Sequence, residues 1–310
     1  MHSAVLKYID YVARYGSIRR AAGALNVASS AVNRQILNLE AEVGTPLFER
    51  IGGGVRPTPA GDYVIRHARR TLVEWERALT DISALSGKIS GDVKVLAISA
   101  VTVQVLPHAA ATLSRQHPFI SLRIAEVDPG DNDREMRAAL PDVAVLFTDR
   151  RHREYELIER VPMKIGAIMR RDHPLACRTE VSLTECASYP VTLLDGPWAL
   201  SAVAESEFQK TGARFRAIFT TNSLMMSKQA VRAGLCLGFY TPTGFMDELR
   251  SGELVHVPLC EQELAATEWG LFVHRSRAAS PAIRAVARVL STEFEALRAS
   301  LKTLYPGRES

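Results

Sequence analysis

The sequence predicts an α/β protein made of a helical N-terminal head, a long helix and a two-lobed C-terminal region. Three short helical patterns and a glycine-rich turn occupy residues 1–58. An unbroken apolar spacing of three and four residues occupies 59–90. Strand and helix patterns alternate over 91–310. A chain of 310 residues is long enough for two or three such domains.

The composition, with 47% hydrophobic and 23% charged residues, is that of a globular protein and excludes a disordered or fibrous chain. No segment approaches the roughly 20 apolar residues of a membrane-spanning helix, and residues 1–4 lead directly into a helical pattern without signal-peptide features. We therefore expect a cytoplasmic protein with no membrane partner. Residues 1–90 contain 12 Lys and Arg against 8 Asp and Glu, whereas 91–310 are neutral overall. The positive first third favours a polyanionic partner.

The first two predicted helices begin the head. Apolar residues repeat at helical spacing up to Gly16, which ends the first helix. Ser17 is expected to cap the second helix, whose apolar face includes Ile18 and Leu25. Asn26 follows at a tight corner, because asparagine tolerates the left-handed backbone that such a corner requires.

A third helix is expected to begin at Ser29 or Ser30, with either serine as its cap. Its apolar stripe packs on the second helix and consists of Val32, Ile36, Leu39 and Val43. The opposite side is polar and short-chained at its start, which suits the major groove of DNA, and carries Ser29, Ser30, Asn33, Arg34 and Leu37. Spacing alone leaves open an ordinary helical hairpin with a solvated polar face.

A two-stranded wing is predicted after this helix. Gly44 ends the helix, and a glycine-rich turn at 52–54 follows. Arg50 and Arg56 flank the turn, so that a flexible loop and two cations would meet the DNA backbone. The head is therefore expected to be a winged helix-turn-helix over residues 1–58.

A long linker helix is expected over residues 59–90. Thr58 caps it and Pro59 takes its first position. Its apolar residues follow a coiled-coil seam and are Ile65, Ala68, Leu72, Trp75, Leu79 and Ile82. Such a seam needs a partner, and the simplest one is a second copy of the chain. Packing of Leu72 and Trp75 on their own domain is the alternative.

Several motifs of the head occur together and in order. They are residues 16–22, 25–36, 39–40, 44–50 and 58–61. These runs cover most of the segment that they span, and they resemble the signature of LysR-type transcriptional regulators. The resemblance implies that the third helix enters the major groove, that the wing follows the minor groove and that the long helix pairs two chains.

Carried over residue by residue, the resemblance implies DNA contacts from Arg19, Ser29, Ser30, Asn33, Arg34, Arg50 and Arg56. The chain departs from the family pattern at three places. Serines follow Ala28 where Ser-Gln-Ser is usual, Asn33 stands where serine is common, and Gly53 stands where a wing arginine is common. The first two departures alter the expected base preferences, and the missing arginine predicts a shallower salt dependence.

Strands and helices alternate after residue 91, which implies a parallel, doubly wound sheet. The expected strands are 93–98, 121–127, 142–147, 164–170, 215–221, 237–240 and 266–273, and the expected helices are 102–116, 131–140, 200–211, 224–233 and 281–304. Two α/β lobes joined by crossing strands resemble the LysR effector domain, which is built like a periplasmic binding protein. Lobe I then comprises about 91–161 and 267–310, and lobe II about 162–266.

The effector site is expected at the carboxyl ends of the strands, where helix N-termini direct amide hydrogens inward. The candidates are Ser99, Thr102, Phe147 and Thr148 in lobe I, and Gly196, Trp198, Thr221, Asn222, Tyr240 and Thr241 in lobe II. Their hydroxyl, amide and aromatic groups suit a small carboxylate or an aromatic metabolite. For each single residue, a hydroxyl that only caps a helix is the alternative.

Other classes of function lack their motifs. The sequence contains no GxSxG, P-loop, HExxH or strand-linked GxGxxG, so we expect no enzyme activity and no cofactor. The four cysteines form neither a CxxC pair nor a zinc spacing, so we expect no metal, while a redox role of Cys177 and Cys186 stays open. A DNA-binding protein without an effector would leave residues 91–310 unexplained.

The expected partners follow from this organisation. A two-fold dimer reads an inverted repeat in double-stranded DNA. Pairing of the long helices and separate pairing of the effector domains give a homodimer or homotetramer. A small-molecule effector is expected between the lobes, and RNA polymerase is a further candidate partner.

Overall fold

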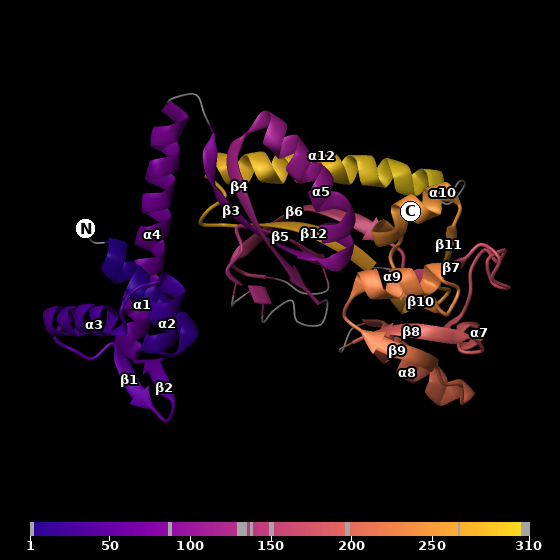
Figure 1. Cartoon of the computed structure of the whole chain (residues 1–310), viewed down its shortest axis with the longest axis horizontal. Helices are drawn as coiled ribbons and strands as arrows, with labels where there is room; N and C mark the ends of the chain where they lie inside the picture. Colours follow the sequence, from indigo (N-terminus) through magenta and orange to yellow (C-terminus); the bar gives the residue numbers. More distant parts are fainter. Residues whose placement is uncertain are drawn as a thin grey trace. The chain divides into compact units, whose positions relative to one another are not determined.

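A computed structural model describes residues 3–85, 89–128, 135–136, 139–148, 152–195, 199–265 and 267–304. The chain divides into two compact units, Met1–Ser86 and Gly87–Ser310 (Figure 1). Each unit has its own hydrophobic core. None of the described helices is long and apolar enough to cross a membrane. The helix expected over 131–140 lies largely outside the described residues.

Three helices form the core of the N-terminal unit, namely α1 (Ser3–Tyr15), α2 (Ile18–Leu25) and α3 (Ser29–Val43). Ile9, Val12, Ala21, Val32 and Ile36 are buried between them. The Ser17 hydroxyl accepts the Arg20 amide at 3.4 Å, and Asn26 has a φ of 54°. The predicted cap and the left-handed corner of the helix-turn-helix are therefore confirmed.

The start of α3 differs from the prediction. Ala28 is the N-cap and makes no side-chain hydrogen bond, so neither Ser29 nor Ser30 caps the helix. Both serines lie in the first turn and are exposed. The extended backbone of Ala28, with a ψ of 135°, sets the direction in which the helix starts. The two hydroxyls consequently remain available on the surface.

The predicted wing is formed by β1 (Phe48–Ile51) and β2 (Gly54–Pro57), which pair antiparallel. Helix α4 (Pro59–Leu85) follows, and the Thr58 hydroxyl accepts the Gly61 amide at 3.0 Å as its cap. Ile65 and Ala68 of the predicted seam are buried, Ile65 in the core of the head. Trp75 is 54% exposed and Leu72 is half-buried. The side chains of Leu79 and Ile82 lie outside the described residues.

Lobe I is built on a five-stranded sheet of order β4-β3-β5-β12-β6. Its strands are β3 (Ser90–Ile98), β4 (Phe119–Val127), β5 (Val143–Phe147), β6 (Tyr155–Met163) and β12 (Thr267–His274). Helices α5 (Ser99–Gln116) and α12 (Pro281–Leu304) pack against the sheet and each other. The core encloses Trp269 and Phe294, both fully buried.

Lobe II is built on a second sheet, of order β11-β7-β10-β8-β9. Its strands are β7 (Gly166–Arg170), β8 (Pro190–Leu194), β9 (Arg216–Thr221), β10 (Leu237–Tyr240) and β11 (Leu254–Pro258). Its helices are α7 (Leu183–Cys186), α8 (Ala199–Thr211), α9 (Leu224–Arg232), the short 3-10 helix η2 (Pro242–Phe245), α10 (Met246–Ser251) and α11 (Gln262–Ala265).

Both sheets are mixed, so the expectation of a parallel sheet is wrong for part of each lobe. β3 is parallel to β4 and β5, and β8 is parallel to β9 and β10. β12 is antiparallel to β5 and β6, and β7 is antiparallel to β10 and β11. The chain passes directly from β6 to β7 and returns from β11 to β12. The strands at these two crossings between the lobes, β6, β7, β11 and β12, are the ones that pair antiparallel with each neighbour given for them.

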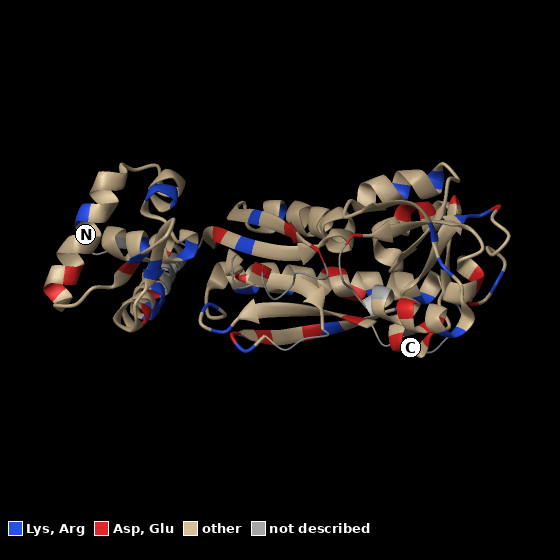
Figure 2. Ribbon diagram, turned by 90° about the horizontal axis from the view of Figure 1, so that it is seen from below, with Lys and Arg blue, Asp and Glu red and all other residues tan. Residues whose placement is uncertain are grey.

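The distribution of charge in the C-terminal unit agrees with its neutral sequence. Lys and Arg alternate with Asp and Glu over both lobes (Figure 2). The net charge of the chain, +4, therefore comes from residues 1–90.

Candidate functional sites

Helix α3 exposes the face on which the sequence placed DNA contacts. Ser29, Ser30 and Arg34 are exposed, Asn33 is half-buried, and Leu37 is 54% exposed. Val32 and Ile36, on the other side of the same helix, are buried in the head. The predicted residues are thus brought together on one surface, with hydroxyl, amide, guanidinium and apolar groups that match what base edges offer in a major groove.

Glu40 fixes the wing to α3, a role that the sequence patterns did not indicate. Its Oε1 atom accepts the backbone amides of Leu47 at 2.7 Å and Phe48 at 3.1 Å. A carboxylate that accepts two amides holds the first strand of the wing at a set distance from the helix. The sequence feature that could have indicated this role is a glutamate in the last turn of the helix, just before the wing.

The wing also approaches the head too closely for most side chains. A Cβ atom added to Gly54 would lie 2.2 Å from the carbonyl oxygen of Gly16. That same oxygen accepts the Val55 amide at 2.9 Å. The glycine therefore allows the second strand of the wing to dock on the start of the helix-turn-helix.

The arginines predicted to contact DNA outside α3 differ in whether an acidic side chain of the head already binds them. Arg19 on α2 and Arg50 on β1 are exposed. Arg56 on β2 is exposed too, but its Nε atom donates to Glu49 Oε1 at 2.8 Å across the wing. The guanidinium of Arg56 is therefore already partly neutralised by a side chain of the same hairpin.

A buried carboxylate joins α4 to the head. Asp10 is 2% exposed, and its two oxygens accept from Arg14 and from Arg69 at 2.7 Å each. Because Arg69 belongs to α4, this pair of contacts fixes the base of the long helix to α1.

The predicted effector residues fall into two groups. A cavity of about 50 Å³ lies between the lobes and is lined by Ile98, Ser99, Ala100, Phe147, Leu194, Leu224, Tyr240 and Thr241. Ser99, Phe147, Tyr240 and Thr241 were predicted, and both lobes contribute. We call this cavity the cleft. Ile98, Ala100, Leu194 and Leu224 were missed, because apolar residues that line a cleft carry the same pattern as core residues.

A carboxylate of the chain itself occupies the hydroxyls expected to bind an anion. Ser99 Oγ donates to Glu126 Oε1 at 2.8 Å, and Thr102 Oγ1 donates to Glu126 Oε2 at 2.5 Å. Glu126 lies near the end of β4, beside the first turn of α5. Its charge thus takes the place at the helix N-terminus that an anionic effector would prefer.

The other predicted residues lie outside the cleft lining. Thr148 donates to Glu268 Oε2 at 3.2 Å. Thr221 accepts the Ser223 amide at 3.1 Å as part of a turn. The Asn222 amide donates from lobe II to Asp128 of lobe I at 3.5 Å. Gly196 and Trp198 lie outside the described residues.

Tyr240 contributes its ring to the cleft while its hydroxyl faces lobe II. Burial raises the pKa of the Tyr240 hydroxyl to about 12, and the neighbouring hydroxyls of Ser227 and Thr192 oppose this rise. The Tyr240 carbonyl lies 3.1 Å from His256 Nε2 on β11. The tyrosine is therefore held neutral and in place by its own lobe.

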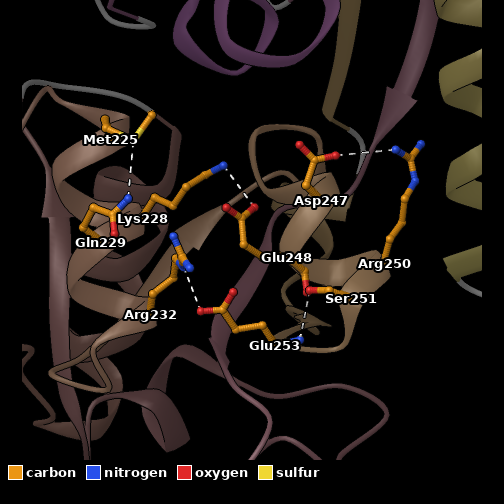
Figure 3. A network of polar contacts seen from close by, with 9 residues as sticks. All are labelled: Met225, Lys228, Gln229, Arg232, Asp247, Glu248, Arg250, Ser251 and Glu253. Atoms are coloured by element: carbon orange, nitrogen blue, oxygen red, sulfur yellow. Dashed lines mark hydrogen bonds and ion pairs between the residues drawn. The ribbon is translucent and has the colours of Figure 1, made fainter.

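A network of charged pairs fixes α9, whose first residue Leu224 lines the cleft (Figure 3). Lys228 and Glu248 of α10 are both largely buried and 3.0 Å apart, and Arg232 binds Glu253 at 2.7 Å. Lys228 also lies over the Phe245 ring, 5.5 Å from its centre. These contacts hold α9, η2 and α10 together as one wall of lobe II.

A larger cavity, of about 320 Å³, lies within lobe II between α8 and the strands β8 and β9. It is distinct from the cleft except for Leu194, which lines both. Of these two cavities, the cleft is the one lined by residues of both lobes.

The described residues contain no group of His, Cys, Asp and Glu that could hold a metal ion. Cys177 is exposed and Cys186 is buried, and both are free. Burial raises the pKa of the Cys186 thiol to about 12. This thiol is therefore protonated near neutral pH, which does not favour disulfide exchange.

Comparison with known proteins agrees with this organisation. Residues 4–62 match the bacterial regulatory helix-turn-helix protein model of the lysR family, and residues 86–295 match the LysR substrate binding domain. The chain is 28% identical to a RuBisCO operon transcriptional regulator of Allochromatium vinosum, over 93% of this chain and 95% of that protein. It is 29% identical to a probable nitrogen assimilation transcriptional activator of Synechocystis sp., over 64% of this chain and 65% of that protein.

The solved structures show the same fold. A full-length OxyR variant from Pseudomonas aeruginosa superimposes with a TM-score of 0.63 at 20% identity, and the match covers 95% of each chain. The two family models together cover most of the sequence, including both the outward-facing α3 and the two-lobed unit. The chain belongs to the LysR family of DNA-binding transcriptional regulators, which carry a substrate-binding effector domain and are not enzymes.

Proposed function

We propose that this regulator reads an inverted repeat in double-stranded DNA through α3 and the wing, and that a small molecule bound in the cleft changes how it sits on that DNA. Because the regulator acts on DNA, we place it in the cytoplasm. The observation that carries the proposal is the pairing of two features in one chain. Residues 29–34 present a polar face on a braced winged head, and the cleft is lined by both lobes of the second unit.

Arg34 is the side chain on α3 best suited to read a base. It is exposed in the second turn of the helix, beside the half-buried Asn33, and arginine binds guanine with two hydrogen bonds. Ser29, Ser30 and Asn33 supply the remaining contacts on the helix. Arg19, Arg50 and Arg56 contribute phosphate or minor-groove contacts.

The effector acts by changing the relation of the lobes. The chain crosses twice between them, so they move as two bodies about those crossings. A molecule that contacts Phe147 of lobe I and Tyr240 of lobe II stabilises one arrangement over the other by its differential affinity. Dimers formed through α4, joined into tetramers through the effector domains, then change the spacing of their DNA-binding heads. RNA polymerase is the partner through which such a change would alter transcription.

The effector class proposed here is a small carboxylate or an aromatic metabolite, and the lining of the cleft sets different conditions for the two. Phe147, Tyr240, Leu194 and Leu224 give a lining that suits an aromatic or apolar group. A volume of about 50 Å³ is well below the roughly 300 Å³ at the lower end of common ligand pockets, so the lobes must open to admit it. A carboxylate effector must in addition displace Glu126 from Ser99 and Thr102.

DNA recognition is tested by footprinting the full-length protein over a genomic library and then by the substitution Arg34→Ala. Loss of the base contact should weaken specific binding by about 1–3 kcal/mol and leave binding to random DNA almost unchanged. Arg66→Ala on α4, which removes an exposed arginine above the Tyr63 ring, is the matched control. Absence of preference for any duplex would refute sequence-specific binding.

The effector is tested by a thermal-shift screen of metabolites, because a molecule that binds only the folded protein raises its melting temperature. Hits are then compared in the wild type and in Thr241→Trp, which fills the cleft. Stabilisation that disappears in this variant supports the cleft. If no compound class stabilises the protein or alters its footprint, the chain acts as a DNA-binding protein without an effector.

A further inference from the structure

A second cavity, larger than the cleft, lies in lobe II and has no part in the proposed function. It has a volume of about 320 Å³ and is lined by Leu193, Leu194, Leu200, Ala204, Glu205, Phe208, Arg214, Phe215 and Thr220. Helix α8 forms one side, and β8 and β9 form the other. Its volume is within the common range for small-molecule sites, about 300–1,000 Å³.

The interior of this cavity is apolar and well supported. Leu200 and Ala204 are buried in the core of lobe II. Phe208 and Phe215 meet edge to face with ring centres 4.6 Å apart, and Phe215 lies 5.1 Å from the Phe239 ring. Aromatic rings held by one another form a rigid wall, which suits a branched or aromatic group of a ligand.

Two side chains of opposite charge line the same cavity. Glu205 is on α8, and Arg214 lies in the connection between α8 and β9. Both are exposed, and within the described part of the chain neither forms an ion pair. An apolar interior with one anionic and one cationic group complements a molecule that carries an ammonium, a carboxylate and an apolar chain.

We propose that this cavity is a second small-molecule site, separate from the cleft, that binds an α-amino acid with a large apolar side chain. The carboxylate of the amino acid pairs with the Arg214 guanidinium, and its ammonium pairs with the Glu205 carboxylate. The side chain enters between Phe208, Phe215 and Leu200. Neither an acid nor an amine alone satisfies both charges, so the site distinguishes the zwitterion from each half.

Leu194 gives this site a route to the cleft. It is the last residue of β8 and lines both cavities. An amino acid that moves Leu194 therefore alters the wall against which an effector packs. Coupling of this kind is reciprocal, so an effector in the cleft changes the affinity for the amino acid by the same factor.

The test uses the full-length protein and three probes that share a phenyl group: L-phenylalanine, phenylacetate and phenethylamine. Isothermal titration should show binding of L-phenylalanine and at least tenfold weaker binding of the other two. Arg214→Gln and Glu205→Gln should each weaken L-phenylalanine binding at least tenfold. Arg216→Gln, which removes an exposed arginine two residues along that does not line the cavity, should leave the binding unchanged.

Three results would overturn the proposal. The first is no binding of L-phenylalanine or L-leucine by the wild type at millimolar concentration. The second is equal binding of phenylacetate and L-phenylalanine, which indicates an organic-acid site. The third is loss of binding in Thr241→Trp but not in Arg214→Gln, which assigns the amino acid to the cleft. DNA binding by each variant, measured in parallel, keeps a folding defect separate from a loss of the site.

Discussion

At the scale of single residues, the wing carries its own counter-ion. Glu49 accepts from Arg56 across the hairpin, so one of the few basic side chains near the predicted DNA backbone is partly neutralised. Glu49→Gln should free Arg56 and raise the affinity for DNA roughly threefold to tenfold at low salt. The slope of log affinity against log salt should steepen by about 1.

Fluorescence anisotropy over a series of salt concentrations measures both quantities. Glu42→Gln, which removes an exposed glutamate of α3, is the matched control for net charge. An equal gain in both variants would mean that the general field of the head, and not the release of Arg56, controls the affinity.

A second prediction at the scale of single residues concerns Glu126 and the binding of the effector. Its carboxylate occupies the hydroxyls of Ser99 and Thr102. In Glu126→Gln the charge is gone, so carboxylates in the metabolite screen should raise the melting temperature of this variant more than that of the wild type. Neutral compounds should act equally on both, as they should on the control Glu156→Gln. An equal rise in melting temperature with carboxylates in all three proteins would show that Glu126 does not compete with the effector.

At the scale of elements, a histidine locks three strands of lobe II together. The His256 ring on β11 packs on Gly166 of β7, where an added Cβ would lie 2.4 Å from the ring. Burial lowers the pKa of His256 from 6.5 to about 4. Between these values the unfolded chain binds more protons than the folded one, so stability falls as the pH falls from 6.5 toward 4.

The loss attributable to His256 should be on the order of 1–2 kcal/mol, because the side chain is half-buried. Urea unfolding of the full-length protein at several pH values measures this loss, and His256→Asn should flatten the dependence of stability on pH. Burial also lowers the pKa of His173 and of His274, so some slope should remain. His67→Asn on α4 is the control. If this variant flattened the pH dependence to the same extent, the effect could not be attributed to His256.

The sequence predicted elements well where a periodic pattern was bounded by a cap or a glycine. The helix-turn-helix, the wing and α12 have this form, and α12 begins and ends where it was expected. The strands β6, β8 and β11 were missed. Each contains a proline at its first, last or second-last position, and the burial of β8 extends over only part of its five residues. A proline next to a short apolar run indicates a loop as readily as a strand.

The face of α3 and the cleft were predictable from the sequence to different degrees. Exposed polar residues on an otherwise amphipathic helix identify a surface, so the face of α3 followed from the sequence. The cleft depends on apolar residues such as Leu194 and Leu224, whose pattern is that of a core. The contact of Glu126 with Ser99 joins residues far apart in the chain, and no local pattern indicates it.

At the scale of the whole molecule, the two units have different tasks, and α4 is the element that must combine them. Its first seam residues are used inside the head, where Ile65 is part of the core and Asp10 holds Arg69. Further along, Trp75 is 54% exposed, an unusual state for the largest apolar side chain. We therefore expect the free part of the seam to begin at Leu72 and to bind the same part of a second chain.

Replacing Leu72 and Trp75 together by glutamate should abolish the pairing through α4 and lower the mass of the assembly, because like charges would face each other across a two-fold seam. Sedimentation velocity measures the change in mass. Binding to a two-site operator should weaken steeply, while binding to a single half-site should change little, because the braced head of each chain remains intact. Replacement of the exposed Tyr63 and Glu74 on the same helix is the matched control. Dimers that survive the seam substitutions with full operator affinity would place the pairing surface elsewhere, and the exposed Trp75 would then need another partner.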